Sequence, residues 1–363
     1  MAITVLRFPP GGGLDLELSA SDAEIHEYSE RCSKLLHLLQ RPGVVVLELE
    51  DDSAWAPLKA CLKRCDSFFS LDRPIKEKAS SSVPGEGFSR PNGKELLAFR
   101  RFSGASGLAA GNAQSLDGAC RVLDSLGRSV LRGVSRSAEL DIHAEQLSPL
   151  LEEDPQLRRR PSASILRASC YPDVAEEEGP PALAFAAHHD RGVLTLVASN
   201  QTGGLQVQLP PGAGGGGGEG VGEWADVPLG PGRVAVLVGF SLSYALGGLV
   251  RPALHRVAPG GPRRVSLAYE LCFRPGARID PAEVLREAAT APERPVGRPL
   301  YLSELMALFE TTHPVSINGK RSLDVGACRF LFEWRRIGGN STPEELGLKD
   351  GNVIIVVMEQ VGS

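Results

Sequence analysis

The chain has 363 residues, of which 42% are hydrophobic, and a formal net charge of -5 at pH 7. This length and composition are sufficient for one large globular domain or two ordinary ones, each with a buried core. Lysine and arginine are scattered along the chain and form no basic stripe, so we expect no nucleic-acid partner. The sequence has no run of about 18 apolar residues and no secretory signal pattern. We therefore expect no membrane partner and a cytoplasmic location, with the nucleus as an alternative compartment.

The seven cysteines of the chain include no CxxC pair. An odd number of scattered cysteines is typical neither of a disulfide framework nor of a structural zinc site. Cys61 and Cys65 have the spacing of neighbours on one face of a helix. We expect the thiols to be reduced, as they are in a reducing compartment.

The first part of the chain, residues 1–155, alternates between helical and strand-like patterns. Residues 21–39 begin with Ser and Asp and then place apolar residues at helical spacing, which predicts a helix. The β-branched run 43–49 predicts a strand, and residues 55–69 return to helical periodicity. We interpret residues 1–155 as an N-terminal α/β cap region.

Two further segments complete this cap region. Residues 80–93 are rich in Ser, Pro and Gly, which predicts a loop. Residues 117–153 have the pattern of two helices that are broken near residues 133–136. His143 and Glu145 form a His-x-Glu motif in the second helix. Side chains two residues apart on a helix diverge, so we do not expect this pair to share a metal.

Between residues 156 and 310 the pattern changes to short runs that alternate or are wholly apolar. Eight such runs, separated by turn signals, predict an antiparallel barrel or a double-sheet jelly roll. The runs are SILRASCY, LAFAAHHD, GVLTLVAS, GLQVQL, EWADVPL, RVAVLVGF, ALHRVAP and RVSLAYELCF. The glycine-rich residues 212–222 interrupt them and are interpreted as a flexible hairpin insertion. A phosphate-binding loop is the alternative, but no Gly-Lys-Ser/Thr follows the glycines.

Two histidines and one aspartate in this region form a candidate metal site. Alternate side chains of a strand share a face, so His188 and Asp190 are expected on one side and His189 on the other. A third ligand must come from another strand, and His255 lies in a β-like run further along the chain. Two histidines and one carboxylate leave three positions of a non-haem iron open for dioxygen and an organic acid. A buried histidine with a structural role is the alternative interpretation of His255.

The run that follows His255 adds a candidate anion site. Arg264 and Ser266 share one face of the predicted strand, with Val265 on the other. A guanidinium binds a carboxylate in a two-pronged geometry, and a hydroxyl adds one more hydrogen bond. An arginine buried in a barrel also needs a compensating anion. We interpret the pair as the anchor of a dicarboxylate; a surface arginine, as expected of Arg263, is the alternative.

These motifs resemble those of the isopenicillin N synthase-like branch of the 2-oxoglutarate- and Fe(II)-dependent dioxygenases, which is abundant in plant specialised and hormone metabolism. The resemblance covers about residues 20–310. It is carried, in family order, by HHDRGVLTLVASN, GGLQV, EWADVPLGPGRVAVLVGFSL, ALHRV and RVSLAYELCF. By this resemblance His188, Asp190 and His255 are the iron ligands. No catalytic residue is expected beyond the iron centre.

The same resemblance implies how the co-substrate is held. Arg264 and Ser266 match the family's Arg-x-Ser motif and are expected to anchor 2-oxoglutarate. The segment ILRASCYPD is similar to a family strand that carries a tyrosine before proline, which places Tyr171 near the co-substrate carboxylate. Two positions depart from the family pattern: Ser169 stands where relatives often have Asn, and Phe240 stands where many have Asp.

The implied reaction is oxidation of a small organic metabolite, by hydroxylation, desaturation or demethylation. Fe(II), 2-oxoglutarate and O2 are the implied cofactor and co-substrates, with ascorbate as a reductant, and 2-oxoglutarate is decarboxylated to succinate. A relative that uses no 2-oxo acid is less compatible with the complete Arg-x-Ser motif.

The last part of the chain, residues 311–363, has a different pattern. RFLFEW, the helix start at residues 342–345 and NVIIVVME resemble the C-terminal half of small ubiquitin-like modifiers. The opening hairpin of that fold is missing and the chain does not end in paired glycines. The resemblance therefore implies a partial tail that binds a protein partner, not a covalent tag. There are three alternatives to a protein-binding tail: the segment packs on the barrel, it is partly disordered, or it originates in a fused or misassembled gene model.

The sequence thus predicts a mainly β protein with α elements. A double-stranded β-helix (jelly-roll) core over residues 156–310 follows the helical cap of residues 1–155. A short α+β, partial β-grasp-like tail occupies residues 311–363. The alternative to an active oxygenase is a catalytically silent barrel that acts as an adaptor through the tail.

Overall fold

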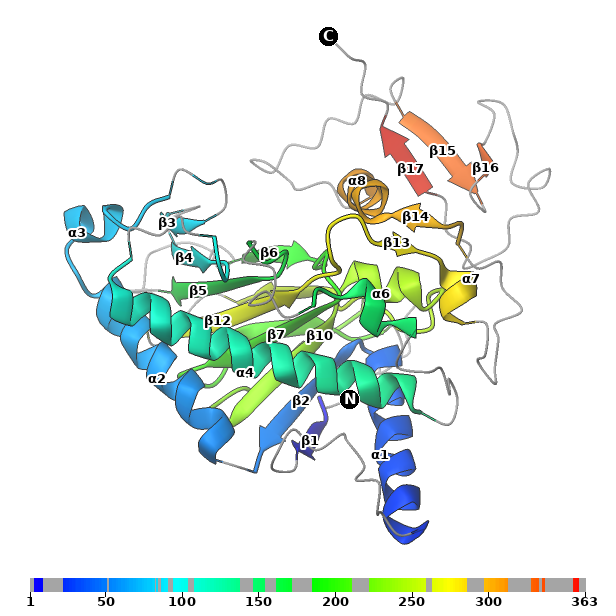
Figure 1. Ribbon diagram of the computed structural model, residues 1–363, viewed down its shortest axis with the longest axis horizontal. Helices are drawn as coiled ribbons and strands as arrows, with labels where there is room; N and C mark the ends of the chain where they lie inside the picture. The colour runs from blue at the N-terminus through cyan, green and yellow to red at the C-terminus, as the bar shows by residue number, and fades with distance from the viewer. Residues whose placement is uncertain are drawn as a thin grey trace.

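The computed structural model describes most of the chain (Figure 1). The described residues are 3–8, 22–50, 52–81, 83, 86–90, 94–103, 108–137, 146–153, 161–171, 185–210, 222–258, 263–285, 297–312, 328–332, 335–336 and 355–358. Among the helices in these ranges, none combines the length and apolar composition that a bilayer span requires.

Two β-sheets form the centre of the molecule (Figure 1). The larger sheet contains, in spatial order, β1 (Val5–Phe8), β2 (Val44–Leu49), β10 (Arg233–Val238), β7 (Leu194–Ser199), β12 (Arg264–Leu271), β5 (Ile165–Tyr171), β4 (Glu95–Phe99) and β3 (Gly87–Ser89). The smaller sheet contains β6 (Phe185–His188), β11 (His255–Val257), β8 (Leu205–Gln208) and β9 (Trp224–Asp226). The eight runs predicted as strands form β5 to β12 in order. They lie in two sheets, as in the double-sheet jelly roll, which was one of the two predicted arrangements.

Neighbouring strands are antiparallel, with one exception at the edge of the larger sheet, where β1 and β2 are parallel. The smaller sheet is antiparallel throughout. Its strands β8 and β9 form a hairpin in which Gln208 pairs with Trp224. The glycine-rich segment therefore connects two paired strands, as predicted, although residues 211–221 themselves lie outside the described part of the chain.

Each face of the larger sheet packs against a different apolar cluster. On β10, Val234, Val236 and Val238 belong to the main core, which the sheet shares with the helices. Ala235 and Leu237 belong to a second cluster, between the two sheets. This division follows from the two-residue period of a strand. The space between the sheets is the interior to which the candidate site residues belong.

Three helices cover the outer face of the larger sheet (Figure 1). They are α1 (Asp22–Gln40), α2 (Asp52–Phe69) and α4 (Ala110–Ser135), and the short α3 (Arg73–Glu77) follows α2. Buried apolar residues of all three long helices join the main core. Both helices and the strand predicted before residue 70 are confirmed.

Residues 80–93, which were predicted as a loop, contain a short strand. β3 (Gly87–Ser89) pairs with β4 at the edge of the larger sheet. Gly87 has a φ of 76°, and a Cβ at this position would lie 2.6 Å from the carbonyl oxygen of Ala79. The glycine thus permits a tight approach of two backbones. The loop prediction was wrong here because Gly, Pro and Ser mark the turns around so short a strand.

The segment predicted as two helices, residues 117–153, forms one long helix and one short turn. Helix α4 ends at Ser135, where the break was predicted. Among the described residues beyond it, the further helical element of this segment is the 3-10 helix η4 (Ser148–Leu150), not a second α-helix. Residues 138–145, which include the His-x-Glu motif, lie outside the described part of the chain.

Short elements complete the end of the barrel. They are α6 (Phe240–Ala245), β13 (Arg278–Ile279), α7 (Pro281–Val284), β14 (Leu300–Tyr301) and α8 (Leu302–Thr312). The amide of Leu302 donates a hydrogen bond of 2.8 Å to the carbonyl of Ala277. The ring of Phe309 lies 5.3 Å from that of Phe240. Helix α8 is therefore packed against the barrel.

A three-stranded antiparallel sheet follows α8 in the sequence. Its strands are β15 (Cys328–Phe332), β16 (Arg335–Arg336) and β17 (Ile355–Met358), and β15 lies in the middle. Both strands that the sequence predicted in this tail are present. The predicted helix start at residues 342–345 lies outside the described part of the chain.

Candidate active site

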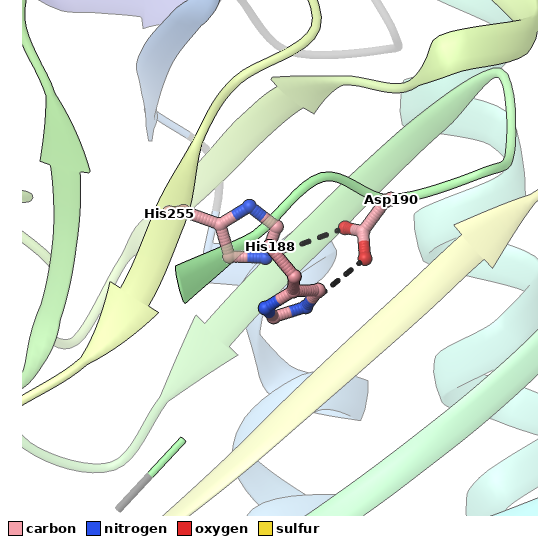
Figure 2. Close-up of side chains that lie close together, drawn as sticks. All are labelled: His188, Asp190 and His255. Carbon is pink, nitrogen blue, oxygen red and sulfur yellow. Dashed lines mark ion pairs between the residues drawn. The ribbon is translucent and has the colours of Figure 1, made fainter. Parts of the chain in front are cut away.

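The three predicted metal ligands lie together at the edge of the smaller sheet (Figure 2). His188 is the last residue of β6 and His255 is the first residue of β11, and the two are direct partners in the antiparallel register. Asp190 follows two residues after His188. One ligand atom from each side chain lies within 4.8 Å of the others. Whether this cluster holds iron stays a prediction, but its members can reach one ion together.

The donor atoms of the cluster face one another. Nε2 of His188 lies 3.5 Å from Oδ1 of Asp190, and Nε2 of His255 lies 3.6 Å from Oδ2. Among the described residues, Oδ2 of Asp190 is buried and accepts no hydrogen bond. A buried carboxylate oxygen without a donor is costly, and a cation between the three side chains would satisfy it.

Both imidazoles are oriented in the same way by the backbone. Nδ1 of His188 lies 2.9 Å from the carbonyl oxygen of Ala186, and Nδ1 of His255 lies 3.0 Å from that of Ala253. A carbonyl oxygen accepts a hydrogen bond, so each Nδ1 carries the proton and each Nε2 keeps its lone pair. Metal-binding histidines commonly have such a second hydrogen bond.

The charges of the cluster suit metal binding. Burial raises the pKa of Asp190, but His255 and His188 outweigh this effect and hold the pKa well below its usual range. Burial lowers the pKa of His255, and the nearby Asp190 offsets part of that shift. The site therefore presents an ionised carboxylate and, at neutral pH, an uncharged imidazole, which are the forms that bind a metal.

The strand argument for Asp190 was only partly right, because β6 ends at His188 and Asp190 lies in the turn that follows. The start of α6 fixes this turn. The amide of Phe240 donates a hydrogen bond of 2.8 Å to the carbonyl of Asp190, and the hydroxyl of Ser241 donates one of 2.6 Å to that of Arg191. Phe240 thus contributes through its backbone amide, whichever side chain stands at this position.

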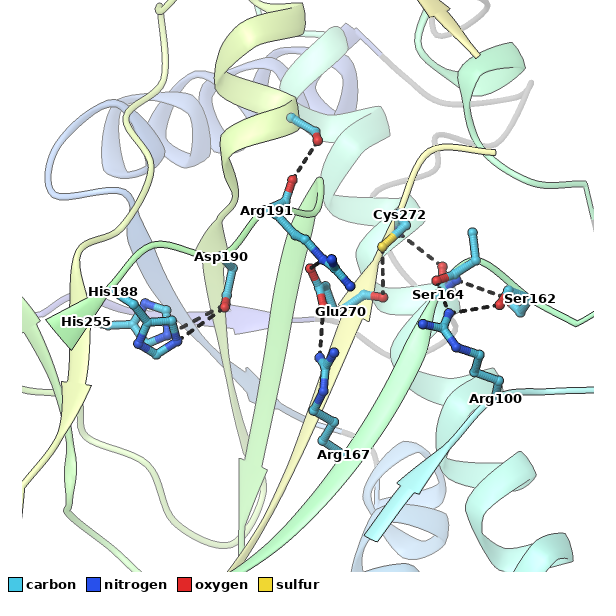
Figure 3. A network of polar contacts seen from close by, with 12 residues as sticks. Arg100, Ser162, Ser164, Arg167, His188, Asp190, Arg191, His255, Glu270 and Cys272 are labelled. Carbon is cyan, nitrogen blue, oxygen red and sulfur yellow. Dashed lines mark hydrogen bonds and ion pairs between the residues drawn. The ribbon is translucent and has the colours of Figure 1, made fainter. Parts of the chain in front are cut away.

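An ionic network around the buried Glu270 supports the same turn from the larger sheet (Figure 3). Glu270 of β12 accepts a hydrogen bond of 2.8 Å from Arg167 of β5, and its other oxygen lies 3.6 Å from Nε of Arg191. Arg191 directly follows Asp190. Glu270 is 5% exposed, so this network links the interior of two strands to the metal-binding turn. No local sequence pattern indicates this network, because only the fold brings these three residues together.

The predicted co-substrate anchor lies on the larger sheet. Arg264, the first residue of β12, pairs with Tyr171, the last residue of β5, and its guanidinium carbon lies 4.7 Å from the centre of the Tyr171 ring. In the same register Ser266 pairs with Ser169. Arg264 is 6% exposed and forms no ion pair or hydrogen bond with any described residue. A buried guanidinium in this state is suited to an anionic ligand.

A glycine that the sequence analysis did not single out makes room for this arginine. Gly204 has a φ of 85°, and a Cβ at this position would overlap the guanidinium of Arg264. Gly204 also accepts a hydrogen bond of 2.7 Å from the amide of Ala258, just beyond β11. The anchor is thus connected to the strand that carries His255. The Gly-Gly pair before the β8 run was the sequence signal.

The part of the chain that contains these residues matches a known family model. Residues 162–273 match the model of the 2OG-Fe(II) oxygenase superfamily. We refer to residues 162–273 as the oxygenase segment. The oxygenase segment includes all the predicted metal ligands and co-substrate residues.

Plant oxidases are among the curated relatives of the chain. Gibberellin 20 oxidase 2 of Oryza sativa subsp. indica is 31% identical over 121 residues, which cover 33% of this chain and 28% of that protein. Gibberellin 2-beta-dioxygenase 3 of Arabidopsis thaliana is 31% identical over 109 residues, or 30% of each chain. The match spans less than a third of the length of these relatives.

Solved structures extend the likeness of the fold beyond the oxygenase segment. A full-length Neurospora crassa protein in complex with alpha-KG and thymine has a TM-score of 0.67 and 18% identity, covering 84% of this chain and 96% of that one. The rice dioxygenase for auxin oxidation has a TM-score of 0.62 and 18% identity, covering 84% of this chain and 94% of that one. At this identity the likeness concerns the fold.

Proposed function

We propose that this protein is an Fe(II)- and 2-oxoglutarate-dependent oxygenase that oxidises a small organic metabolite. One observation carries the proposal: His188, Asp190 and His255 converge around a buried carboxylate oxygen that accepts no hydrogen bond from any described residue. The cluster lies within a segment of the 2OG-Fe(II) oxygenase superfamily. The unpaired Arg264 supports a dicarboxylate co-substrate in the same interior.

In this proposal the chain's own residues bind, orient and exclude water. His188, His255 and Asp190 would hold Fe(II) through Nε2 and carboxylate atoms, with the carbonyls behind the imidazoles keeping the rings in place. Arg264 and Ser266 would bind the distal carboxylate of 2-oxoglutarate. Bound iron would supply the oxidation of the substrate, coupled to conversion of 2-oxoglutarate and O2 to succinate and CO2.

One further residue and one apolar cluster support this role. Tyr171 packs its ring against the Arg264 guanidinium and limits the positions available to it. The apolar cluster between the sheets keeps water from the interior behind the site. Ascorbate would act from solution as a reductant, and we propose no site for it.

The test is succinate release from 2-oxoglutarate by the iron-loaded full-length chain. His188→Ala removes one ligand, so we expect succinate production to be lost. Arg264→Ala removes a charge-assisted anchor worth about 1.5 to 4 kcal/mol, so the 2-oxoglutarate requirement should rise by roughly one to three powers of ten. Arg263→Ala is the matched control, because Arg263 instead pairs with Asp66. Equal succinate production by wild type and His188→Ala would reject the assigned centre.

We also propose a cytoplasmic or nuclear location. The six cysteines whose side chains the structure describes are all free thiols, in keeping with a reducing compartment.

A second role, protein binding by the C-terminal tail, remains a proposal. The order of helix α8 and strands β15, β16 and β17 is compatible with part of a ubiquitin-like unit. The packing of α8 against the barrel favours a tail that is attached to the oxygenase, so binding through it would accompany catalysis.

A further inference from the structure

A buried lysine just before β4 has no anionic partner within the described part of the chain. Lys94 is 9% exposed, and its ammonium lies 3.5 Å from the centre of the Phe185 ring. Among the residues that the structure describes, none forms an ion pair or a hydrogen bond with this ammonium. An aromatic ring offsets only part of the free energy that a buried ammonium loses with its hydration.

The position of Lys94 connects it to the metal centre. The ring of Phe185 lies 4.5 Å from the ring of His188, on the same strand β6. Lys94 therefore reaches the immediate surroundings of a predicted metal ligand through one aromatic side chain. It also directly precedes Glu95, whose partner on β5 is Cys170, the neighbour of Tyr171.

The other cations of this region already have an assigned counter-charge. Arg167 and Arg191 share the carboxylate of Glu270. Arg264 is assigned to the distal carboxylate of 2-oxoglutarate. Among the described residues, none provides a counter-charge for Lys94. Burial, and to a smaller extent the like charge of Arg167, lower the pKa of Lys94 to about 8, which is the expected state of a cation that lacks an anion.

We propose that Lys94 binds an anionic group, a carboxylate, on the organic substrate. This inference rests on the proposed function and specifies the substrate as an acid whose apolar body lies beside Phe185. The ion pair would compensate the buried ammonium only when substrate is present, so binding energy would depend on the charge of the ligand.

2-Oxoglutarate does not account for Lys94. The strand order places β5 between β4 and β12, so the backbones at Lys94 and Arg264 are about 10 Å apart. The co-substrate has two carboxylates, of which one is assigned to Arg264 and the other to the metal. Since no described residue supplies a third anionic group, we assign that group to a different molecule.

The experiment measures binding of matched acids and amides by calorimetry. The probes are phenylacetate, 3-phenylpropionate and octanoate, each compared with its primary amide. The full-length chain is loaded with Fe(II) and 2-oxoglutarate under anaerobic conditions. We expect at least one acid to bind wild type about tenfold or more tightly than its amide. Lys94→Met should abolish this preference, and Lys94→Arg should retain part of it.

Lys63→Met is the control, because Lys63 is exposed on α2. It should keep the full preference for the acid, and circular dichroism checks that each variant is folded. The proposal is overturned if no acid is preferred over its amide by wild type, or if the preference survives in Lys94→Met. It is also overturned if Lys94→Met weakens 2-oxoglutarate binding instead.

The outcome is separable from that of the proposed function. A chain that produces no succinate in the assay above would fail as an oxygenase, whatever its preference among these probes. A chain that produces succinate but binds acids and amides equally would remain an oxygenase, with Lys94 excluded as its substrate contact.

Discussion

At the scale of single residues, the candidate site depends on buried polar atoms that form no hydrogen bond with the described part of the protein. Oδ2 of Asp190, the guanidinium of Arg264 and the ammonium of Lys94 are all buried in this state. Each costs folding free energy, since the unfolded chain would hydrate it. Three such groups facing one interior indicate that ligand binding, rather than stability, determines their identity.

A substitution of Gly204 tests whether the guanidinium of Arg264 needs the space beside this glycine. Gly204→Ala should weaken 2-oxoglutarate binding by about tenfold or more, because the new methyl group displaces the guanidinium from its position. Gly203→Ala is a matched control: Gly203 has a φ of 84°, close to the 85° of Gly204, but no atom lies within 4 Å of its hypothetical Cβ. Both variants carry the same backbone strain, so equal 2-oxoglutarate affinities measured by calorimetry would contradict the proposed role of Gly204.

Lys94 should make stability depend on pH in the ligand-free protein. Its pKa falls from 10.5 to about 8 on folding, so the unfolded chain binds the proton more tightly. The destabilisation is complete below pH 8, amounts to about 3 kcal/mol, and disappears as pH rises to 10.5. Lys94→Met should therefore be more stable than wild type in urea at pH 7, and the difference should close by pH 10.5. A difference that is independent of pH would contradict this expectation.

At the scale of elements, the strand period explains most of what the sequence predicted. Eight runs between residues 156 and 310 form strands, and Arg264 and Ser266 lie on a strand as predicted, whereas Asp190 lies in the turn beyond β6. β1 and β3 at the edges of the larger sheet, and the short β4 beside β3, were missed because short strands have weak patterns. Gly204 and Lys94 were missed for a different reason: their importance arises from neighbours that are distant in sequence, which a local pattern does not contain.

The network around Glu270 couples two strands to the turn that carries Asp190. Glu270→Gln removes the charge shared by Arg167 and Arg191, so unfolding free energy should fall by about 1 to 3 kcal/mol. Fe(II) affinity should fall about tenfold, because the turn that carries Asp190 loses a support. Glu48→Gln is the control, since its pair with Arg233 is more than a third exposed and should contribute less than about 1 kcal/mol. Equal losses in the two variants would reject a special role for Glu270.

At the scale of the whole molecule, the barrel and the tail are joined by α8. Truncation after Thr312 keeps this helix and removes the sheet of β15, β16 and β17. We expect succinate release and the melting temperature to be nearly unchanged, since the candidate site and the main core lie before residue 313. A truncated chain that unfolds or loses activity would make the tail a structural part of the oxygenase.

Successive side chains of β5 lie on opposite faces of the sheet, so substitutions on one face affect the core and those on the other face affect the ligand-binding side. Leu166, Ala168 and Cys170 pack into the core beneath the helices, whereas Arg167 and Tyr171 between and beyond them face the opposite layer. Mutational change at every second position can therefore alter ligand selectivity while the scaffold keeps its packing. A library randomised only at the odd-numbered positions of this strand is the natural starting point for testing which side chains determine ligand selectivity.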